Sequence, residues 1–247
     1  MEFKETEAGQ SKEMPEKVVV YGVPKIGKSR IASQIPDVFF IDIEGGLNYL
    51  GKKVRATPRL HSFDEVIGWL KHIHDNETFI AGAIAIDSLD WLENLAQAKL
   101  IKQEGAASIT DPACKAFAYN KGVDMAAHDA AKVLRWLDAI WKKKGIRSLL
   151  IAHNEVKTVD LPNQDPYSRH QMKLSKQLAA KTNEWADLIL YCDYSFHVTK
   201  DGKTSEPKPV VYTGGSAAFV GGGRMKLTKE LPIDDNTYNN LLKEITK

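Results

Sequence analysis

The sequence is poor in cysteine and in long apolar runs, and each shortage excludes a class of protein. Its 247 residues include two cysteines, Cys114 and Cys192, which lack C-x-x-C spacing. With no such spacing and no nearby histidine pairing, the cysteines imply neither a zinc site nor a disulfide framework, so we expect two free thiols in a reducing cytosol. No apolar run reaches the length of a membrane span, which argues against a membrane protein.

The sequence also has little net charge. The formal charge is +2, so bulk charge does not indicate nucleic-acid binding and any basic surface must be local. A hydrophobic fraction of 43% and a charged fraction of 27% are ordinary for a globular protein. Residues 1–16 are polar and lack the apolar segment of a signal peptide, so we expect a flexible tail before one domain at residues 17–247.

The strongest motif that is present is a phosphate-binding loop. Residues 22–29 read G-x-x-x-x-G-K-S and directly follow the apolar run 17–21. A strand, this loop and a helix form the P-loop, whose glycines let backbone N–H groups converge on phosphate oxygens. We expect Lys28 to contact the β- and γ-phosphates of ATP and Ser29 to bind Mg²⁺. The predicted nucleotide site comprises Gly22, Val23, Pro24, Lys25, Ile26, Gly27, Lys28, Ser29 and Arg30.

Strands and helices alternate along the chain. Apolar runs that are typical of strands buried on both faces lie at residues 38–43, 79–86, 148–152 and 186–191. Helical patterns lie at residues 29–34, 63–74, 91–102, 121–144 and 171–184. Ser62 and Glu65 have capping-box spacing. The order predicts an α/β fold with a mainly parallel sheet flanked by helices, and chemistry at the carboxyl ends of the strands.

The remaining segments are less regular. Residues 104–120 suggest an insertion-like ordered loop, and residues 157–169 suggest a polar loop. Residues 195–199 and 210–213 are expected to form an antiparallel hairpin. Asp235 is expected to cap a last helix, so that residues 195–247 add a hairpin and a C-terminal helix to the single domain.

Two strand ends supply carboxylates. Asp87 ends an apolar strand in the Walker B form, whose carboxylate holds Mg²⁺. Ser88 follows it, where many ATPases carry the catalytic base, so the base must come from elsewhere. Glu44 at the end of another strand is best placed to orient the attacking water. Asp42 and Asp90 are weaker candidates.

A third strand end carries His153, followed by Asn154. A polar side chain at this place can hydrogen-bond the γ-phosphate and report its presence to the following loop. A purely structural histidine is the alternative.

Cations and an aromatic residue gather in and just after that loop. Cations pair with phosphates and aromatic rings stack on bases, which suits single-stranded DNA. A solvated loop is the alternative, because acidic residues dilute the charge. The DNA-binding candidates are Lys157, Tyr167, Arg169, His170 and Lys173.

Two further cations, Arg224 and Lys226, follow the glycines at 221–223. Such residues can act as a finger on the nucleotide of a neighbouring subunit. A solvated basic loop is again the alternative.

These residues together resemble the RecA/RadA-type ATPase core. FFIDIEGGL resembles the strand that carries the catalytic glutamate and matches Glu44. AIAIDSLDWL resembles the Walker B strand and matches Asp87 and Ser88, and LLIAHNEVK resembles the sensor strand that runs into the second DNA-binding loop. The resemblance implies a RecA-like P-loop NTPase core that hydrolyses ATP, with Glu44, Lys28 and His153 in catalysis.

The order of motifs resembles more closely a family of phage-encoded, core-only ATP-binding proteins that includes the Sak-type single-strand-annealing recombinases. The resemblance covers residues 18–243 and includes AYNKGVDMAAHDAAKVLRWLDAIW, YSRHQMKLSKQLAAKTNEWADLILYC and GGRMKLTKELP. It implies a DNA-stimulated ATPase that binds single-stranded DNA and promotes annealing or recombination. It also implies a single-stranded-DNA-binding protein as partner, a ring or filament of identical subunits, and the bacterial host cytosol as location.

Two other functions fit the same nucleotide residues. One is a helicase- or loader-like DNA motor, and the histidine at position 153 is more helicase-like than the Asn-Gln pair usual in RecA proteins. The other is an ATP-gated binding module for a replication partner.

Overall fold

The structure is a computed structural model that describes residues 14–196, 205–225, 227–228 and 230–246. Within these residues the sheet runs in the order β10-β8-β7-β1-β5-β4-β2-β3, with β6 paired to β5 and β9 paired to β7. The strands are β1 (Lys17–Gly22), β2 (Val38–Asp42), β3 (Arg55–Ala56), β4 (Ala83–Asp87), β5 (Arg147–Leu161), β6 (Gln164–Met172), β7 (Leu188–Ser195), β8 (Lys208–Tyr212), β9 (Gly222–Gly223) and β10 (Glu230–Pro232).

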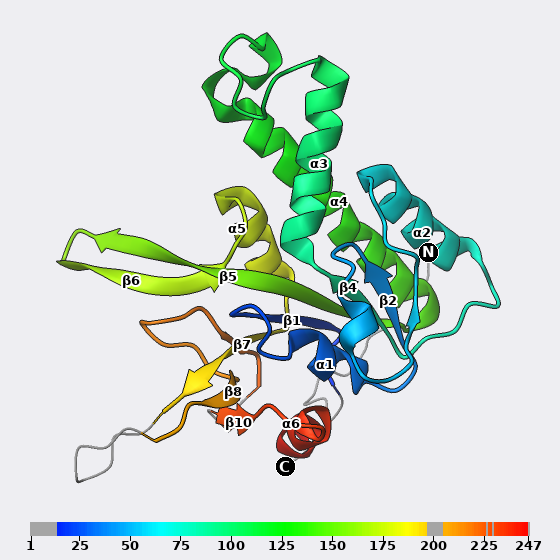
Figure 1. The fold of residues 1–247 in the computed structure, drawn as a ribbon, viewed down its shortest axis with the longest axis vertical. Helices are drawn as coiled ribbons and strands as arrows, with labels where there is room; N and C mark the ends of the chain where they lie inside the picture. The colour runs from blue at the N-terminus through cyan, green and yellow to red at the C-terminus, as the bar shows by residue number, and fades with distance from the viewer. Residues whose placement is uncertain (1–13, 197–204, 226, 229, 247) are drawn as a thin grey trace, which may run out of the picture.

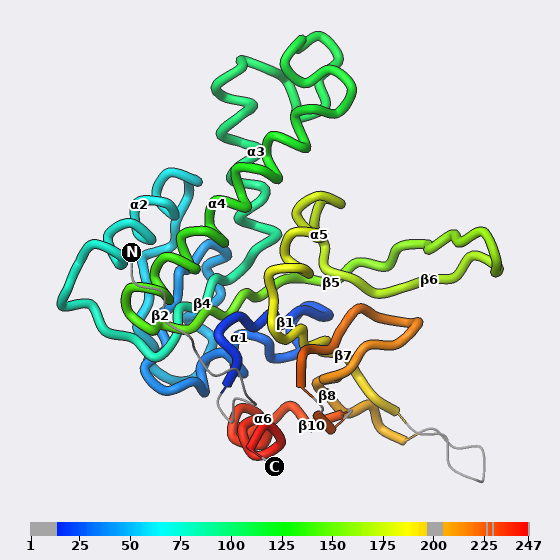
Figure 2. Tube along the Cα trace, turned by 180° about the vertical axis from the view of Figure 1, so that it is seen from behind, coloured from blue at the N-terminus to red at the C-terminus, as the bar shows by residue number. Residues whose placement is uncertain are grey.

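Helices cover both faces of this sheet (Figures 1 and 2). One face packs on α2 (Phe63–Asp75), α3 (Leu89–Glu104), α4 (Lys121–Lys144) and α5 (Lys176–Trp185). The other packs on α1 (Lys28–Ser33) and α6 (Thr237–Ile245). Two short 3₁₀ helices, η1 (Leu47–Tyr49) and η2 (Lys115–Asn120), complete the described elements.

The buried strands alternate their side chains between these two layers. In β1, Val19 and Tyr21 join the core under α2–α5, whereas Val18 and Val20 join the core under α1 and α6. Successive side chains of a strand point to opposite faces, so a continuous apolar run is what a sheet covered on both sides requires. The predicted α/β fold with a mainly parallel sheet is confirmed: β3, β2, β4, β5, β1 and β7 are parallel neighbours.

Most predicted helices form where their patterns lie. The helix expected at residues 121–144 is α4, and α2 begins at the capping box in which Ser62 and Glu65 satisfy each other's backbone N–H groups. Residues 104–120 are ordered: η2 ends this segment and the ring of Phe117 is 2% exposed. The α3–η2–α4 tip projects from the body of the molecule in both views (Figures 1 and 2).

The prediction of a polar loop at residues 157–169 is wrong. The chain there forms a long antiparallel hairpin of β5 and β6, in which Asn154 pairs with Met172 and Lys157 pairs with Arg169. Both figures show this hairpin projecting beyond the sheet, and we call its residues 154–172 the arm. A ribbon with no fully buried face needs no apolar alternation, so its sequence resembles a loop.

Of three neighbouring predictions, one helix start and one helix cap are wrong, and one hairpin forms with different bounds. The helix expected from Gln171 begins at Lys176, because Gln171 still belongs to the arm. The C-terminal hairpin is confirmed, but β7 itself runs through Ser195 and pairs with β8, and residues 197–199 lie outside the described part of the chain. The last helix is capped by Asn236, which makes no side-chain capping bond, rather than by Asp235.

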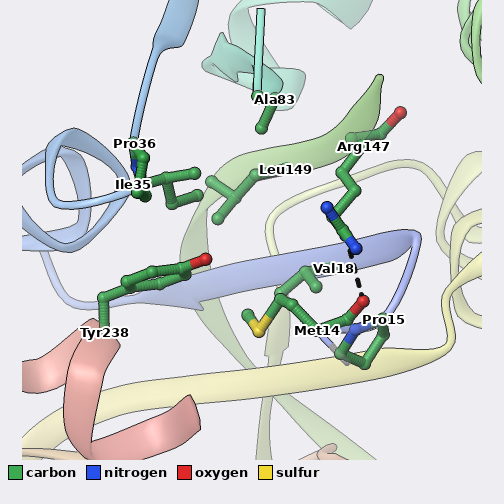
Figure 3. Close-up of a pocket in the computed structure, with 11 residues that line it drawn as sticks. Met14, Pro15, Val18, Ile35, Pro36, Ala83, Arg147, Leu149 and Tyr238 are labelled. Carbon is green, nitrogen blue, oxygen red and sulfur yellow. Dashed lines mark hydrogen bonds between the residues drawn. The ribbon is translucent and has the colours of Figure 1, made fainter. Parts of the chain in front are cut away.

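A cavity of about 130 Å³ lies at the amino ends of the strands, away from the P-loop (Figure 3). Its lining is mostly apolar and includes Met14, Ile35, Leu149 and Tyr238, and Arg147 Nε donates a hydrogen bond across it to Met14 O at 3.2 Å. Met14 is 8% exposed, so the described part of the expected tail packs on the sheet. Residues 1–13 lie outside the described residues.

No described helix combines the length and the apolar character needed to cross a bilayer.

Candidate functional site

The predicted P-loop is a tight turn between β1 and α1. Gly22 approaches β7 so closely that a Cβ atom would lie 2.0 Å from Cys192 O. Lys25 and Gly27 have positive φ angles of 63° and 111°, which curl the backbone back on itself. Only glycine fits at position 22, and the loop makes the tight turn that a phosphate cradle requires.

Lys28 points into this loop. Its Nζ donates hydrogen bonds to Gly22 O at 3.0 Å and Val23 O at 2.9 Å, and the residue is 6% exposed. Burial lowers the pKa of the ammonium, and the carboxylates of Asp87 and Glu44 act in the opposite direction. The charge therefore lies inside the cradle, where phosphate oxygens bind in a P-loop.

Ser29 and Asp87 meet beside the loop. Ser29 Oγ donates to Asp87 Oδ2 at 2.6 Å. Burial raises the pKa of Asp87 to about 6, with the Glu44 and Asp42 carboxylates adding to the effect and the Ser29 hydrogen bond opposing it. A buried carboxylate beside a hydroxyl is a donor set that Mg²⁺ prefers, and the cation would offset the cost of burying the negative charge.

No cluster of three or more His, Cys, Asp or Glu side chains that could hold a metal occurs in the described part of the chain. A magnesium ion held by Ser29 and Asp87 therefore depends on phosphate oxygens and water for its other ligands, as is usual for Mg²⁺ at a nucleotide.

The sheet register brings the other strand ends to the same place. Asp42 pairs with Asp87 across β2 and β4, and Gly22 pairs with His153 across β1 and β5. Glu44 follows β2 and its N–H donates to Asp87 O at 3.1 Å. Asp42 Oδ1 accepts from Gly45 N at 2.7 Å, so this carboxylate holds the turn after β2.

His153 lies between two carboxylates. Its Nδ1 is 2.9 Å from Asp90 Oδ2, and its Nε2 is 3.8 Å from Glu44 Oε1. The backbone N–H of His153 also donates to Asp90 Oδ1 at 3.1 Å. The side chain of Glu44 is 35% exposed and so remains open to water and to a nucleotide. The predicted catalytic residues Lys28, Glu44 and His153 thus gather at one edge of the sheet.

A family comparison agrees with this geometry. Residues 14–225 match the sequence model of the AAA domain, which spans well over half of the chain. The chain belongs to the AAA domain family. An AAA domain is an ATP-binding ATPase domain, and the P-loop with the strand ends around it is the candidate nucleotide site. No curated protein matches the chain.

The arm begins directly at the nucleotide edge of this AAA domain. Lys157 and Arg169 are cross-strand partners, and the next pair along the same face is Val159 with Tyr167. Lys157 Nζ pairs with Glu155 Oε1 at 2.8 Å, whereas Arg169 makes no ion pair with the described residues. Three of the five predicted DNA contacts therefore share one half-buried face of the arm.

The other two candidates lie elsewhere. His170 is on the opposite face. The centroid of its ring lies 5.4 Å from that of the Tyr191 ring, and its Nδ1 is 3.0 Å from Asn154 Nδ2. Lys173 lies at the root of the arm, and its N–H donates to His153 O at 2.8 Å. His170 therefore belongs to the anchoring of the arm, and Lys173 lies close to the nucleotide edge.

Two arginines of the AAA domain are held by carboxylates. Arg30 Nη2 lies 2.7 Å from Asp235 Oδ1, so its side chain turns toward the C-terminal segment and away from the loop. Arg224 lies 3.4 Å from Asp187 with 79% of its side chain exposed. Lys226 lies outside the described residues.

Asp90 is the residue whose position the sequence reasoning missed. The sequence makes Asp90 a weaker candidate for the base, but its carboxylate binds the backbone and ring of His153. The available signal was its place three residues after Asp87, in the first turn of the following helix.

Proposed function

We propose that this AAA domain is a phage-type recombination ATPase that binds single-stranded DNA and promotes its annealing, with a single-stranded-DNA-binding protein as partner. The observation that carries the proposal is the arm. Strand β5 passes the candidate nucleotide site at His153 and continues directly into a ribbon with Lys157, Tyr167 and Arg169 on one face. Cations that pair with phosphates beside a ring that stacks on bases are typical of single-strand binding.

In this proposal the nucleotide edge hydrolyses ATP. Lys28 and the loop N–H groups hold the phosphates, and Ser29 and Asp87 hold Mg²⁺. The ion supplies charge neutralisation at the β- and γ-phosphates. Glu44 orients a water molecule for in-line attack and accepts its proton. His153 contacts the γ-phosphate and transmits its presence to the arm.

The route to the arm is short. His153 precedes Asn154, whose side chain contacts His170 on the returning strand at 3.0 Å. The backbone N–H of His170 donates to Ala218 O at 2.7 Å, and the carbonyl of His170 accepts from Val220 N at 3.0 Å, which ties the arm to the segment around Phe219. A change at His153 therefore reaches both strands of the arm within two contacts.

The proposal includes an assembly of identical subunits as a ring or filament. Its support is Arg224, a largely exposed cation on the segment that follows β9. A head-to-tail arrangement carries such a residue to the nucleotide of the next subunit, where it stabilises charge on the transferring phosphate.

The deciding experiment measures the ATPase rate with and without single-stranded DNA, together with annealing of complementary oligonucleotides. The wild-type protein should hydrolyse ATP faster with DNA and should anneal the strands. No effect of DNA on the rate and no annealing would overturn the recombinase proposal. Directional strand displacement would identify a motor instead.

Arm variants connect that result to the structure. Replacing Lys157, Tyr167 and Arg169 by alanine should abolish the DNA stimulation, and the slope of log affinity against log salt should fall by about 1.4, roughly 0.7 for each lost phosphate contact. Thr158→Ala with Ser168→Ala changes the exposed pair on the opposite face and is the matched control. Equal losses in both variants would place the DNA elsewhere.

A further inference from the structure

Asp90 is a buried carboxylate that makes no contact with the P-loop. It lies in the first turn of α3, three residues after Asp87, and 7% of it is exposed. Both of its carboxylate oxygens contact His153. Oδ1 accepts from the backbone N–H of His153, and Oδ2 lies 2.9 Å from Nδ1 of the same residue. Such double contact sets both the position and the rotation of an imidazole ring.

The contact has an electronic consequence. The Asp90 hydrogen bond raises the pKa of His153 against the effect of burial, while Lys28 lowers it and Glu44 raises it. Burial alone would raise the pKa of Asp90, but the hydrogen bonds and charge of His153 outweigh it and the pKa lies below its usual value. These opposite shifts favour a carboxylate–imidazolium pair.

We propose that Asp90 is the positioning residue of the hydrolytic centre: it holds Nδ1–H of His153 so that Nε2–H faces Glu44 and the γ-phosphate. The proposal rests on the proposed function, in which Glu44 orients water and His153 contacts the phosphate. Asp90 touches neither substrate nor water and acts through the imidazole. It determines the direction and the charge of a ring that would otherwise rotate between two carboxylates, and the tautomer of that ring when it is neutral.

A merely structural role is the competing explanation, because Asp90 also anchors the strand from which the arm begins. Glu93 anchors the other end in the same way: its Oε2 accepts from Ser175 N at 2.9 Å, just after the arm returns. Glu93 is on the same helix, is 4% exposed and makes no contact with His153. Glu93→Gln is therefore the matched control for Asp90→Asn.

The first measurement follows the His153 ring by NMR in the nucleotide-free protein, with His153→Gln assigning its signal. In Asp90→Asn the titration midpoint of His153 should fall toward the ordinary histidine value of about 6.5. The neutral ring should also change tautomer, which the Nδ1 signal reports. In Glu93→Gln the titration midpoint and the Nδ1 signal of His153 should match those of the wild type. An unchanged His153 titration in Asp90→Asn would overturn the proposal, whether or not the protein hydrolyses ATP.

The second measurement is the pH profile of kcat for ATP hydrolysis. Asp90→Asn should lower kcat by about 10- to 100-fold with little change in KM, as for other residues that orient a catalytic group, and should shift the limb of the profile that His153 controls to lower pH. Glu93→Gln should keep the wild-type profile. Equal falls in kcat for both variants with unshifted profiles would assign Asp90 to anchoring alone.

Discussion

At the scale of single residues, burial divides the side chains of the candidate site into two sets. Lys28 and Asp87 are almost fully buried, whereas the side chain of Glu44 is 35% exposed. A group that binds phosphate or Mg²⁺ gains from a low dielectric, because its electrostatic interactions are stronger there. A group that orients water must remain accessible to it, and Glu44 is the only carboxylate among Asp42, Asp87, Asp90 and Glu44 that meets this requirement.

Glu44→Gln should therefore separate binding from hydrolysis. The amide keeps the size of the side chain but cannot accept a proton, so kcat should fall by about 10²- to 10⁴-fold while ATP affinity stays close to the wild type. Steady-state kinetics and nucleotide titration measure the two effects. Lys28→Ala is the reference that loses affinity as well, and hydrolysis retained in Glu44→Gln would remove Glu44 from the role of base.

The Asp90–His153 pair should make stability depend on pH in a defined window. The raised pKa of His153 stabilises the fold fully below about pH 6.5 and its contribution is lost as pH rises through the raised value. The lowered pKa of Asp90 stabilises the fold above about pH 4 and is lost as pH falls through the lowered value. Urea unfolding should show that His153→Gln lowers the free energy of unfolding most between these two pH limits, by about 1.5–3 kcal/mol, and lowers it less toward pH 9. A cost independent of pH would contradict the charged pair.

The residues at the strand ends could be predicted because buried parallel strands end at one edge. The apolar run before Asp87 and the run before Glu44 each required such a strand, and the register then joined them. The contact between Asp90 and His153 could not be predicted, since it depends on how α3 rotates relative to β5. A helix periodicity fixes which face is apolar but not which atom of a polar side chain meets which ring.

At the scale of elements, the arm and α4 show why prediction succeeds in one case and fails in another. α4 buries one stripe of apolar residues along its length, including Val133, Leu137 and Ile140, so its period appears in the sequence. The arm is a two-stranded ribbon whose exposed pairs, such as Thr158 with Ser168, need no apolar alternation. Cross-strand hydrogen bonds hold it together, and these use backbone groups that every residue except proline supplies.

The α3–η2–α4 tip gives a prediction about packing. A Cβ at Gly122 would lie 2.2 Å from Ile109 O and 2.8 Å from the Phe117 ring. Gly122→Ala should therefore destabilise the protein by about 1–3 kcal/mol, because backbone and a buried ring must move. Gly68→Ala in α2, where a Cβ has no neighbour within 4 Å, should stabilise it by about 0.5–1 kcal/mol. Chemical unfolding of both variants measures the difference, and equal effects would contradict the packing of the tip.

At the scale of the whole molecule, the end of the chain supports the beginning of the site. Asp235 binds Arg30, Gln34 Nε2 donates to Asp234 O at 2.6 Å, and Tyr238 N donates to Gln34 Oε1 at 2.9 Å. These contacts join α1 and its C-cap Gln34 to the segment before α6 and to the first turn of α6, so the end of the chain holds the helix that begins with the P-loop lysine, Lys28. They span about two hundred residues of sequence, and no local pattern reveals such pairing, which explains why Asp235 was predicted as a cap.

The proposed assembly can be tested by mixing inactive subunits. Glu44→Gln subunits keep Arg224 but lack the base, and Arg224→Ala subunits keep the base but lack the finger. If Arg224 acts on a neighbour, the mixture should hydrolyse ATP faster than either variant alone, since some sites pair an intact base with an intact finger. Rates measured across mixing ratios at constant total protein give the result. A rate that is the simple average of the two variants would exclude a finger at Arg224.

The continuity of β5 has a mechanical consequence. The strand continues for eight residues past His153 to Leu161, which corresponds to about 26 Å at roughly 3.3 Å per residue, and its pairing with β6 shifts register between Val159 and Leu161. Under the proposed function, the ribbon, which keeps one register from Asn154 to Val159, acts as a lever with its fulcrum at His153. A tilt of about 10° at His153 would then displace the far end by about 5 Å over this length, a distance comparable to the spacing between neighbouring nucleotides in the single strand that we propose it binds.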